Sequence, residues 1–332
     1  MIINGQAGTG KSLLINAIKS YLKNRCIVTA TTGKASFNIN GITIHSLLHL
    51  RVASHSDKDL SGQGLVNLQT KLSTIEYILI DEYSMLGQMT FGWIDRRCRQ
   101  ATGQKQLLFG GISIILIGDP AQLPPVADKP LYHSHSSNSI GQQGYFAYHM
   151  FTKVVLLTVN QRVQGTGCEQ TAFRNLLCHL RNSSINEDDW KLLLTRQPSC
   201  VSNLDKFKDV TRLFYSNKEV ADYNYTKLIE LSSPIATSKA RHSSEKAKQI
   251  SPQDLFGLEP SLLLAKGAVV MLTMNLWASV GLCNGAKGIV KNIIYHEDHR
   301  PPDLPIAGSA NLIFCDLNVF FAPKNIGLDT KI

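Results

Sequence analysis

A glycine-rich segment near the N-terminus has the residue types and spacing of a phosphate-binding turn. Residues 5–12, GQAGTGKS, place glycines where consecutive backbone N–H groups can converge on phosphate oxygens. Lys11 can reach the terminal phosphates of a nucleotide, and the Ser12 hydroxyl can bind Mg²⁺. We therefore expect a nucleoside triphosphate to bind here. The expected contacts are Gly5, Gln6, Ala7, Gly8, Thr9, Gly10, Lys11 and Ser12.

Two adjacent acidic residues follow an apolar run farther along the chain. Residues 78–86, ILIDEYSML, predict a strand that ends at Asp81 and Glu82. We expect Asp81 to hold Mg²⁺, directly or through water, and Glu82 to orient and deprotonate the attacking water. An acidic pair after a strand is often a solvated turn or a helix cap, but the phosphate-binding turn earlier in the chain favours the catalytic interpretation.

A third polar turn, residues 117–126 with the sequence IGDPAQLPPV, follows another apolar run. Its Gln122 carries a carboxamide, which is a poor base but can hydrogen-bond a γ-phosphate or the attacking water. Two prolines stiffen the exit of the turn. We expect Gln122 to contact the γ-phosphate and to report hydrolysis to the next domain.

Apolar runs alternate with amphipathic ones, which predicts the elements that position these residues. The alternation favours an α/β fold in which a parallel sheet is covered by helices. Strands are expected at residues 1–4, 26–30, 75–81 and 112–118, and helices at 12–22 and 85–99, which together form one doubly wound domain to about residue 150. A second α/β unit is expected from strands at 153–159 and 211–216 and helices at 169–181 and 217–229, with a polar loop at 133–144 between the units.

Composition narrows the class of protein. The 332 residues are 43% hydrophobic and 18% charged, which is typical of a globular chain of about two domains. The net charge of +9 favours polyanionic partners. Seven scattered cysteines without a Cys-x-x-Cys pair suit a reducing compartment, and no apolar run is long enough to cross a bilayer. We expect a nuclear or cytoplasmic location, with mitochondria as a further option, and no membrane partner.

With GQAGTGKS, DEYSM and GDPAQLPPV in this order, the chain resembles superfamily 1 helicases, specifically the PIF family of ATP-dependent DNA helicases related to RecD. The resemblance implies a P-loop NTPase fold with a RecA-like ATP-binding domain at residues 1–150. It also implies an incomplete second RecA-like domain at 151–264 and the start of a small β-barrel-type insertion at 265–306, followed by a divergent tail at 307–332. Residues 156–163, LLTVNQRV, match the family's fourth motif and place Arg162 as an arginine finger, although an ordinary surface arginine is as common for this motif alone.

Residues 29–48, TATTGKASFNINGITIHSLL, are similar to the family segment that touches single-stranded DNA. Thr32, Gly33 and Lys34 would offer hydroxyl, backbone N–H and ammonium groups to a phosphate. Phe37 or His45 would stack on a base, because single-strand sites use flat side chains. For His45, a histidine satisfied within the fold is an equal alternative.

The family resemblance implies Mg²⁺-dependent ATP hydrolysis coupled to translocation on single-stranded DNA, 5′ to 3′ unwinding of tailed duplexes, and roles in DNA repair, recombination and telomere maintenance. The family's upstream glutamine segment and two later motifs are not found. We therefore expect a helicase shortened at both ends that binds ATP and single-stranded DNA but separates strands poorly. A DNA-stimulated ATPase without unwinding and a nonenzymatic single-strand-binding fragment remain alternatives, and the sequence does not predict the oligomeric state.

Overall fold

A computed structural model describes most of the chain, namely residues 1–50, 58–134, 136, 138–163, 165, 167–207, 210–240, 244–250, 259–294 and 312–317. The chain divides into two compact units, Met1–Asp209 and Val210–Ile332. The first unit contains all of the predicted site residues, and each unit is described by itself below.

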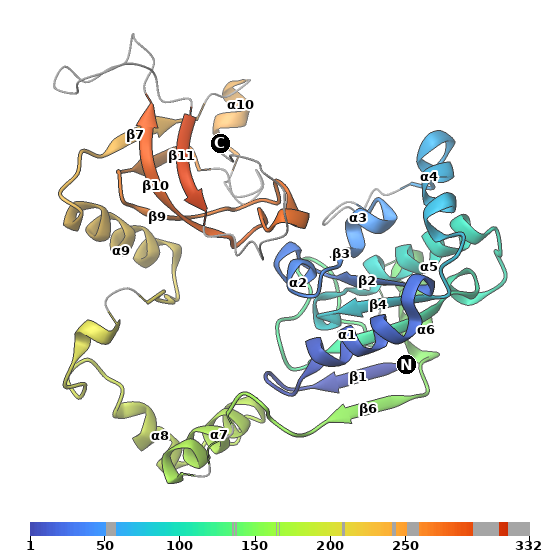
Figure 1. Ribbon diagram of the computed structural model, residues 1–332, viewed down its shortest axis with the longest axis horizontal. Coiled ribbons are helices and arrows are strands. Elements are labelled where there is room, and N and C mark those ends of the chain that lie inside the picture. The colour runs from blue at the N-terminus through green and yellow to red at the C-terminus, as the bar shows by residue number, and fades with distance from the viewer. Residues whose placement is uncertain are drawn as a thin grey trace. The chain divides into compact units, whose positions relative to one another are not determined.

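A six-stranded parallel sheet forms the centre of the first unit (Figure 1). Its strands are β1 (Ile2–Gly5), β2 (Cys26–Ala30), β3 (Ile42–Thr43), β4 (Tyr77–Asp81), β5 (Ser113–Gly118) and β6 (Val154–Leu157). Their order across the sheet is β3-β2-β4-β5-β1-β6. Because every neighbouring pair is parallel, the carboxyl ends of all six strands lie along one edge of the sheet.

Helices cover both faces of this sheet. On one face lie α1 (Lys11–Leu22) and α2 (Gly33–Asn38), and on the other α3 (Ile44–Leu48), α4 (Gly62–Leu72), α5 (Gln88–Thr102) and α6 (Ser139–His149). Strand β4 has apolar side chains on both faces, and helices bury both. Leu79 packs toward α1, while Ile78 and Ile80 pack toward α5. Short 3₁₀ turns η1 (Lys23–Arg25), η2 (Tyr83–Met85) and η3 (Leu108–Gly111) connect these elements. The doubly wound parallel sheet predicted from the sequence is confirmed.

Helix α6 corrects the predicted polar loop at residues 133–144, part of which lies outside the described residues. The Asn138 side chain accepts a hydrogen bond from the Gly141 N–H at 2.8 Å and caps the helix. Gly141, Gly144 and Ala147 are buried along one side of α6, so the helix backbone approaches α5 closely. Small and polar residues that look like a loop in sequence thus form a tightly packed helix.

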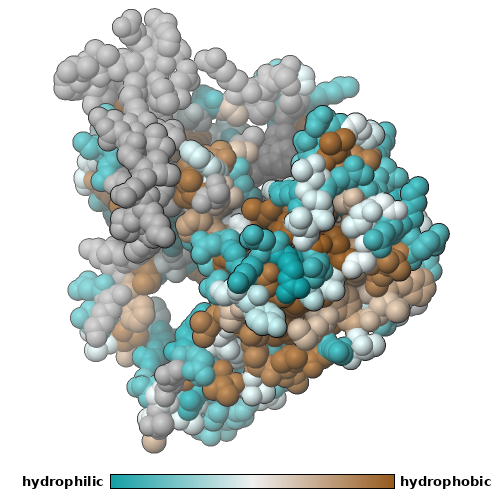
Figure 2. Space-filling view, turned by 45° about the vertical axis from the view of Figure 1, so that its right-hand side comes forward, coloured by the Kyte–Doolittle hydropathy of each residue, from teal (hydrophilic) through white to brown (hydrophobic). Residues whose placement is uncertain are grey.

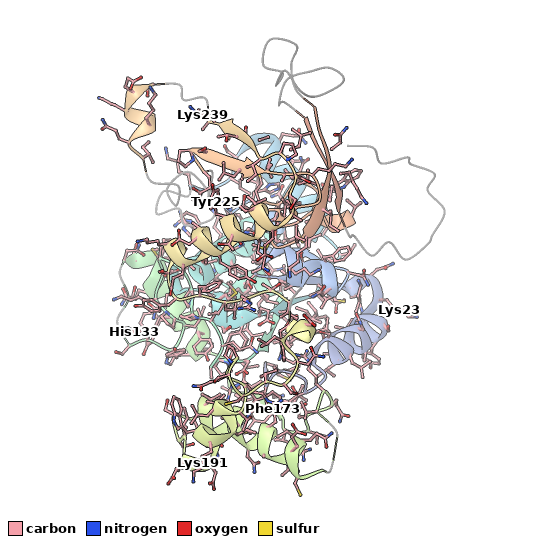
Figure 3. The ribbon with its side chains drawn as sticks, turned by 90° about the vertical axis from the view of Figure 1, so that its left-hand side faces the viewer. Lys23, His133, Phe173, Lys191, Tyr225 and Lys239 are labelled. Atoms are coloured by element: carbon pink, nitrogen blue, oxygen red, sulfur yellow. The ribbon has the colours of Figure 1, made fainter. Side chains whose placement is uncertain are left out.

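Strand β6 corrects the predicted assignment of residues 153–159 to a second unit. The strand pairs with β1, with Ile2 opposite Val154 and Gly5 opposite Leu157, and it is an edge of the first sheet. After it come α7 (Cys168–Arg181), α8 (Glu187–Leu194) and η4 (Leu204–Phe207). Figure 3 labels Phe173 on α7 and Lys191 on α8. The two helices are joined by a hydrogen bond between His179 Nδ1 and Asp189 Oδ2 at 2.6 Å.

The second unit contains two small antiparallel sheets. Helix α9 (Asn217–Glu230) precedes β7 (Ala236–Lys239), which pairs with β8 (Ser261–Leu264), and α10 (Glu245–Lys248) lies between them in sequence. Strands β9 (Val269–Met271), β10 (Lys287–Ile294) and β11 (Leu312–Leu317) form the other sheet, and η6 (Ala278–Val280) lies between β9 and β10 in sequence. Strands β9 and β10 lie within residues 265–306, where the sequence predicted the start of a small β insertion; residues 295–306 lie outside the described residues. The strand predicted at residues 211–216 is wrong, because these residues pair with no described strand, and Tyr215 is fully exposed.

Apolar side chains reach the surface at many points, which Figure 2 shows as brown atoms among teal ones. Along β6, Val154, Val155 and Leu156 are all exposed, as expected for a strand at the edge of the sheet. Within the described residues, no helix is both long enough and apolar enough to cross a bilayer.

Candidate nucleotide-binding site

The glycine-rich turn connects β1 to α1. Gly8 and Gly10 have φ values of +84° and +88°, a backbone region that favours glycine, and α1 begins at Lys11. The Lys11 Nζ donates hydrogen bonds to the carbonyl oxygens of Gly5 at 2.9 Å and Gln6 at 3.2 Å. The ammonium group thus lies over the hollow of the turn, where phosphate oxygens could take the place of these carbonyls.

The other members of the turn surround this lysine. Thr9 is nearly buried, and its hydroxyl donates to the Gln6 carbonyl at 2.8 Å. Ser12 lies in the first turn of α1, one residue after Lys11. A side chain at Gly5 would collide with the Thr9 hydroxyl, which explains the glycine at that position. The structure therefore brings the predicted phosphate-binding residues into one turn at a helix N-terminus.

Asp81 and Glu82 lie at the carboxyl end of β4. Asp81 is 6% exposed, and its Oδ1 accepts a hydrogen bond from the Glu82 N–H at 2.9 Å. Burial is the main reason that the pKa of Asp81 rises to about 6; the Glu82 N–H lowers it and the Glu82 carboxylate raises it. Glu82 has φ +55° and ψ +42°, a left-handed conformation that is uncommon for glutamate and clusters at functional sites.

The residue before the predicted DNA-contacting group helps to hold Glu82. Strand β2 ends at Ala30 beside Asp81, and the next residue, Thr31, donates its N–H to the Asp81 carbonyl at 3.3 Å. The Thr31 hydroxyl donates to the Glu82 carbonyl at 3.2 Å. Thr31 is a site residue that was not predicted, although its place directly after a strand was a usable signal.

The turn that carries Gln122 follows β5, which lies between β4 and β1 in the sheet. The Gln122 N–H donates to the Asp119 carbonyl at 3.0 Å, and the Gln122 side chain is exposed. The buried Asp119 carboxylate accepts the Ala121 N–H at 3.2 Å. It also forms an ion pair with Arg181 of α7, a contact that sequence reasoning missed because the two residues are far apart in the chain.

Arg162 lies against the phosphate-binding turn. The Gln161 N–H donates to the Gly8 carbonyl at 2.7 Å, and the Asn160 side-chain amide donates to the Ala7 carbonyl at 3.3 Å. A methyl group on Gly8 would come within 2.6 Å of the Arg162 Cβ. The two residues before this arginine are therefore bound to the turn, and its exposed side chain starts beside Gly8.

The predicted DNA-contacting residues gather around α2 and α3. Thr32 caps α2 by accepting the Ala35 N–H at 3.2 Å, and the buried Gly33 begins that helix. The exposed Lys34 lies 5.6 Å from the centre of the Phe37 ring. His45 is half-buried in α3 and has a partner within the fold. The structure thus groups Thr32, Gly33, Lys34 and Phe37 on one short helix and places His45 on the next.

The donor set formed by Ser12, in the first turn of α1, and Asp81, at the end of β4, fits Mg²⁺. Ser12 offers a hydroxyl and Asp81 a carboxylate, and Mg²⁺ prefers hard oxygen ligands of this kind together with phosphate oxygens. Asp81 is a buried acid, and a bound cation would compensate its charge. Among the described residues, no group of three or more histidine, cysteine or acidic side chains forms a separate metal site.

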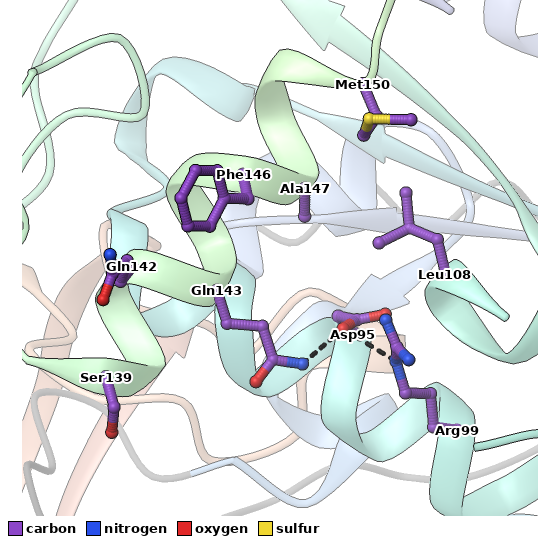
Figure 4. A pocket seen from close by; sticks show the side chains of 9 residues that line it. All are labelled: Asp95, Arg99, Leu108, Ser139, Gln142, Gln143, Phe146, Ala147 and Met150. Carbon is purple, nitrogen blue, oxygen red and sulfur yellow. Dashed lines mark hydrogen bonds and ion pairs between the residues drawn. The ribbon is translucent and has the colours of Figure 1, made fainter. Parts of the chain in front are cut away.

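A pocket of about 330 Å³ lies between α5 and α6, outside this site (Figure 4). Its floor is the buried Asp95 carboxylate, which accepts hydrogen bonds from Arg99, Gln143 and the Phe109 N–H. Because both oxygens are already occupied, the acid holds the helices together and leaves no charge free for a ligand. None of the pocket's lining residues comes from the glycine-rich turn or from the turns after β4 and β5.

The sheet, the glycine-rich turn and the acids at the strand ends define a P-loop NTPase with a RecA-like fold. The model of PIF1-like helicases matches residues 1–191, and that of the Pif1 helicase 2B domain matches residues 258–293. Since the first match covers more than half of the chain, this protein belongs to the PIF1-like helicase family. The 2B match coincides with the β9-β10 region, where the sequence predicted a small β insertion.

Relatives and solved structures agree with this membership. The chain is 29% identical over 319 residues to the ATP-dependent DNA helicase Pif1 of Campylobacter jejuni, covering 90% of this chain and 67% of that protein. It is 29% identical over 303 residues to the human ATP-dependent DNA helicase PIF1, covering 87% and 43%. A crystal structure of Bacteroides Pif1 bound to single-stranded DNA shares the fold at 23% identity, with a TM-score of 0.56, covering 96% and 68%. The chain thus spans about two thirds of one of these relatives and under half of the other.

Proposed function

We propose that this chain is an ATP-dependent DNA helicase that hydrolyses ATP and uses the energy to move along single-stranded DNA. The observation that supports this most is the convergence of three turns at one sheet edge, after β1, β4 and β5. These turns carry Lys11, the acidic pair and Gln122, and Arg162 lies against the first of them. This arrangement supplies groups that can bind the phosphates, accept a proton from the attacking water and stabilise the charge that develops during phosphoryl transfer.

Each residue has a task that its position supports. Lys11 and the backbone N–H groups of the turn would hold the phosphates, replacing the bonds of the lysine to Gly5 and Gln6. Glu82 would accept a proton from the attacking water. Gln122, from the turn after β5, and Arg162, from the segment after β6, would both contact the γ-phosphate. Arg162 would stabilise charge that develops in the transition state.

Mg²⁺ would be held by Ser12 and Asp81. When bound together with ATP, the ion would supply charge neutralisation on the β- and γ-phosphate oxygens. The Asp81 carboxylate is fixed for this task because the Glu82 N–H holds one of its oxygens.

Single-stranded and tailed duplex DNA are the proposed nucleic-acid substrates. Two relatives are named ATP-dependent DNA helicases, and one structural neighbour is a Pif1 bound to single-stranded DNA. The exposed Lys34 and the net charge of +9 suit a phosphate backbone. We propose 5′ to 3′ movement and a role in repair, recombination or telomere maintenance on the basis of the family resemblance.

Steady-state ATP hydrolysis, with and without single-stranded DNA, tests the proposal, together with unwinding of a 5′-tailed duplex. We expect Mg²⁺-dependent hydrolysis that single-stranded DNA stimulates. Stimulated hydrolysis without strand separation would identify a DNA-stimulated ATPase. DNA binding with no hydrolysis under any condition would overturn the proposal in favour of a nonenzymatic single-strand-binding fragment.

A further inference from the structure

A buried carboxylate organises the turn that carries Gln122. Asp119 is 2% exposed and directly follows β5. Its Oδ1 accepts the Ala121 N–H at 3.2 Å, and its main-chain carbonyl accepts the Gln122 N–H at 3.0 Å. Because these two bonds close the turn, the main chain at Gln122 follows any displacement of Asp119.

Arg181 supplies the positive charge that faces this carboxylate. It is the last residue of α7, and its Nη1 lies 2.6 Å from Asp119 Oδ1 and 2.7 Å from Oδ2. The Asp119 side chain is 3% exposed and that of Arg181 25%. Water therefore screens this pair poorly, and the attraction is stronger than in an ion pair at the surface.

The same helix also approaches the phosphate-binding turn. The Cys178 Sγ lies 4.0 Å from Gln6 Oε1, one helical turn before Arg181. The segment that precedes the helix is bound to Ala7 and Gly8 through Asn160 and Gln161. Helix α7 and its leading segment thus contact both turns between which a γ-phosphate would lie.

We propose that Arg181 is a positioning residue for ATP hydrolysis. Through its ion pair with Asp119, Arg181 fixes the position of the turn that carries Gln122 and couples that turn to α7. The inference rests on the proposed ATPase function. Arg181 acts through Asp119 and is not assigned a contact with the nucleotide. Without the guanidinium, the buried carboxylate keeps an uncompensated charge, and the turn must shift to hydrate it. Gln122 then leaves the position from which it meets the γ-phosphate.

The substitution Arg181→Gln tests this, because glutamine keeps a long polar side chain and removes the charge. We expect kcat for ATP to fall by ~10-fold while KM changes by less than ~2-fold, since the phosphate-binding turn itself is intact. Arg181→Lys, which restores the charge, should recover kcat to within ~3-fold of wild type. Asp119→Asn combined with Arg181→Gln should be no slower than the slower single variant, because both changes remove one interaction.

Arg196→Gln is the matched control. It breaks another arginine–carboxylate pair of α7, that of Arg196 with Glu169 at 2.6 Å, in which both side chains are largely exposed. Its kcat should equal that of wild type. Binding of a fluorescent ATP analogue serves as the test of folding, and we expect Arg181→Gln to bind it with wild-type affinity.

Three results would overturn the inference. One is wild-type kcat in Arg181→Gln. Another is loss of analogue binding in both Arg181→Gln and Arg181→Lys, which would indicate a purely structural role. The third is a wild-type chain without ATPase activity, which would remove the proposed function as well. Normal hydrolysis by wild type and by Arg181→Gln would remove this inference alone.

Discussion

Lys11 and Glu82 have separable tasks, because one contacts phosphate and the other contacts water. We expect Lys11→Ala to weaken ATP binding, since the hollow of the glycine-rich turn then lacks its ammonium group. Glu82→Gln should leave binding intact and lower turnover by ~10²-fold or more, because a carboxamide cannot accept the proton. Titration with a fluorescent ATP analogue and steady-state hydrolysis measure the two effects. Equal affinity in wild type and Lys11→Ala would remove the phosphate-binding assignment.

Single residues of the site were predictable where the chemistry is local. The glycines, Lys11 and Ser12 follow one another in the chain, and the turn needs all of them within eight residues. Asp119 and Arg181 could not be found in this way, because they are 62 residues apart and meet only once β5 and α7 are placed. The spacing of residues in the sequence predicts which side chains are neighbours within one element, but it does not predict contacts between elements.

The ends of strands β2 and β4 are joined by Thr31, so neighbouring elements share the task of holding Glu82. We expect Thr31→Val to lower kcat by ~3- to 10-fold with little change in KM, because the left-handed Glu82 peptide loses the hydrogen bond at its carbonyl. Thr31→Ser keeps the hydroxyl and should restore turnover. ATP hydrolysis by the three proteins checks this, and equally slow valine and serine variants would contradict it.

Helices α5 and α6 pack through glycine. An added Cβ at Gly144 would overlap the Gln88 carbonyl oxygen and lie 2.7 Å from the Gly92 nitrogen. We therefore expect Gly144→Ala to lower the free energy of unfolding by ~1–3 kcal/mol, since the helices must move apart. Urea denaturation monitored by circular dichroism measures it.

Gly64 in α4 provides the matched control for this helix substitution. A Cβ there would meet only the Leu60 Cδ2, at 3.8 Å, which is ordinary contact. Gly64→Ala should raise the free energy of unfolding by ~0.5–1 kcal/mol, because alanine favours the helix without a clash. Stabilisation by both substitutions would show that α5 and α6 are not held as closely as Gly144 indicates.

Elements were predictable where hydrophobic periodicity is strong, and less so elsewhere. The runs at 26–30 and 112–118 are apolar and short, and both form central strands. Helix α6 was missed because its buried side is made of glycine and alanine, which carry little hydrophobic signal, although Asn138 was a usable cap signal. At 211–216 an apolar run forms no strand, because a strand requires a neighbour that local sequence does not supply.

At the scale of the whole molecule, the class of fold was predictable and the order of strands was not. Alternating strands and helices predict a parallel sheet. The place of β6 beside β1 depends on which sheet edge is available after β5 has inserted between β4 and β1. Strand β6 therefore joins the first sheet before α7 begins. Because β6 pairs with β1, Arg162 lies beside Gly8.

The net charge of +9 belongs to the whole chain and predicts how its affinity for DNA depends on salt. If the chain holds single strands through phosphates, log affinity should fall linearly with log salt concentration, with a slope of about −0.7 for each phosphate neutralised. Lys34→Ala should make the slope shallower by up to about one such contact, to the same extent for every sequence, because a phosphate contact carries no base information. Fluorescence anisotropy with labelled oligonucleotides at several salt concentrations measures this.

Lys191→Ala is the control, because that lysine is exposed on α8 and already paired with Glu187 at 2.8 Å, so its loss should leave the slope unchanged. An affinity that does not change with salt would remove the electrostatic basis for DNA binding, and equal effects of the two lysine substitutions would show that charge acts through the whole surface and not through α2.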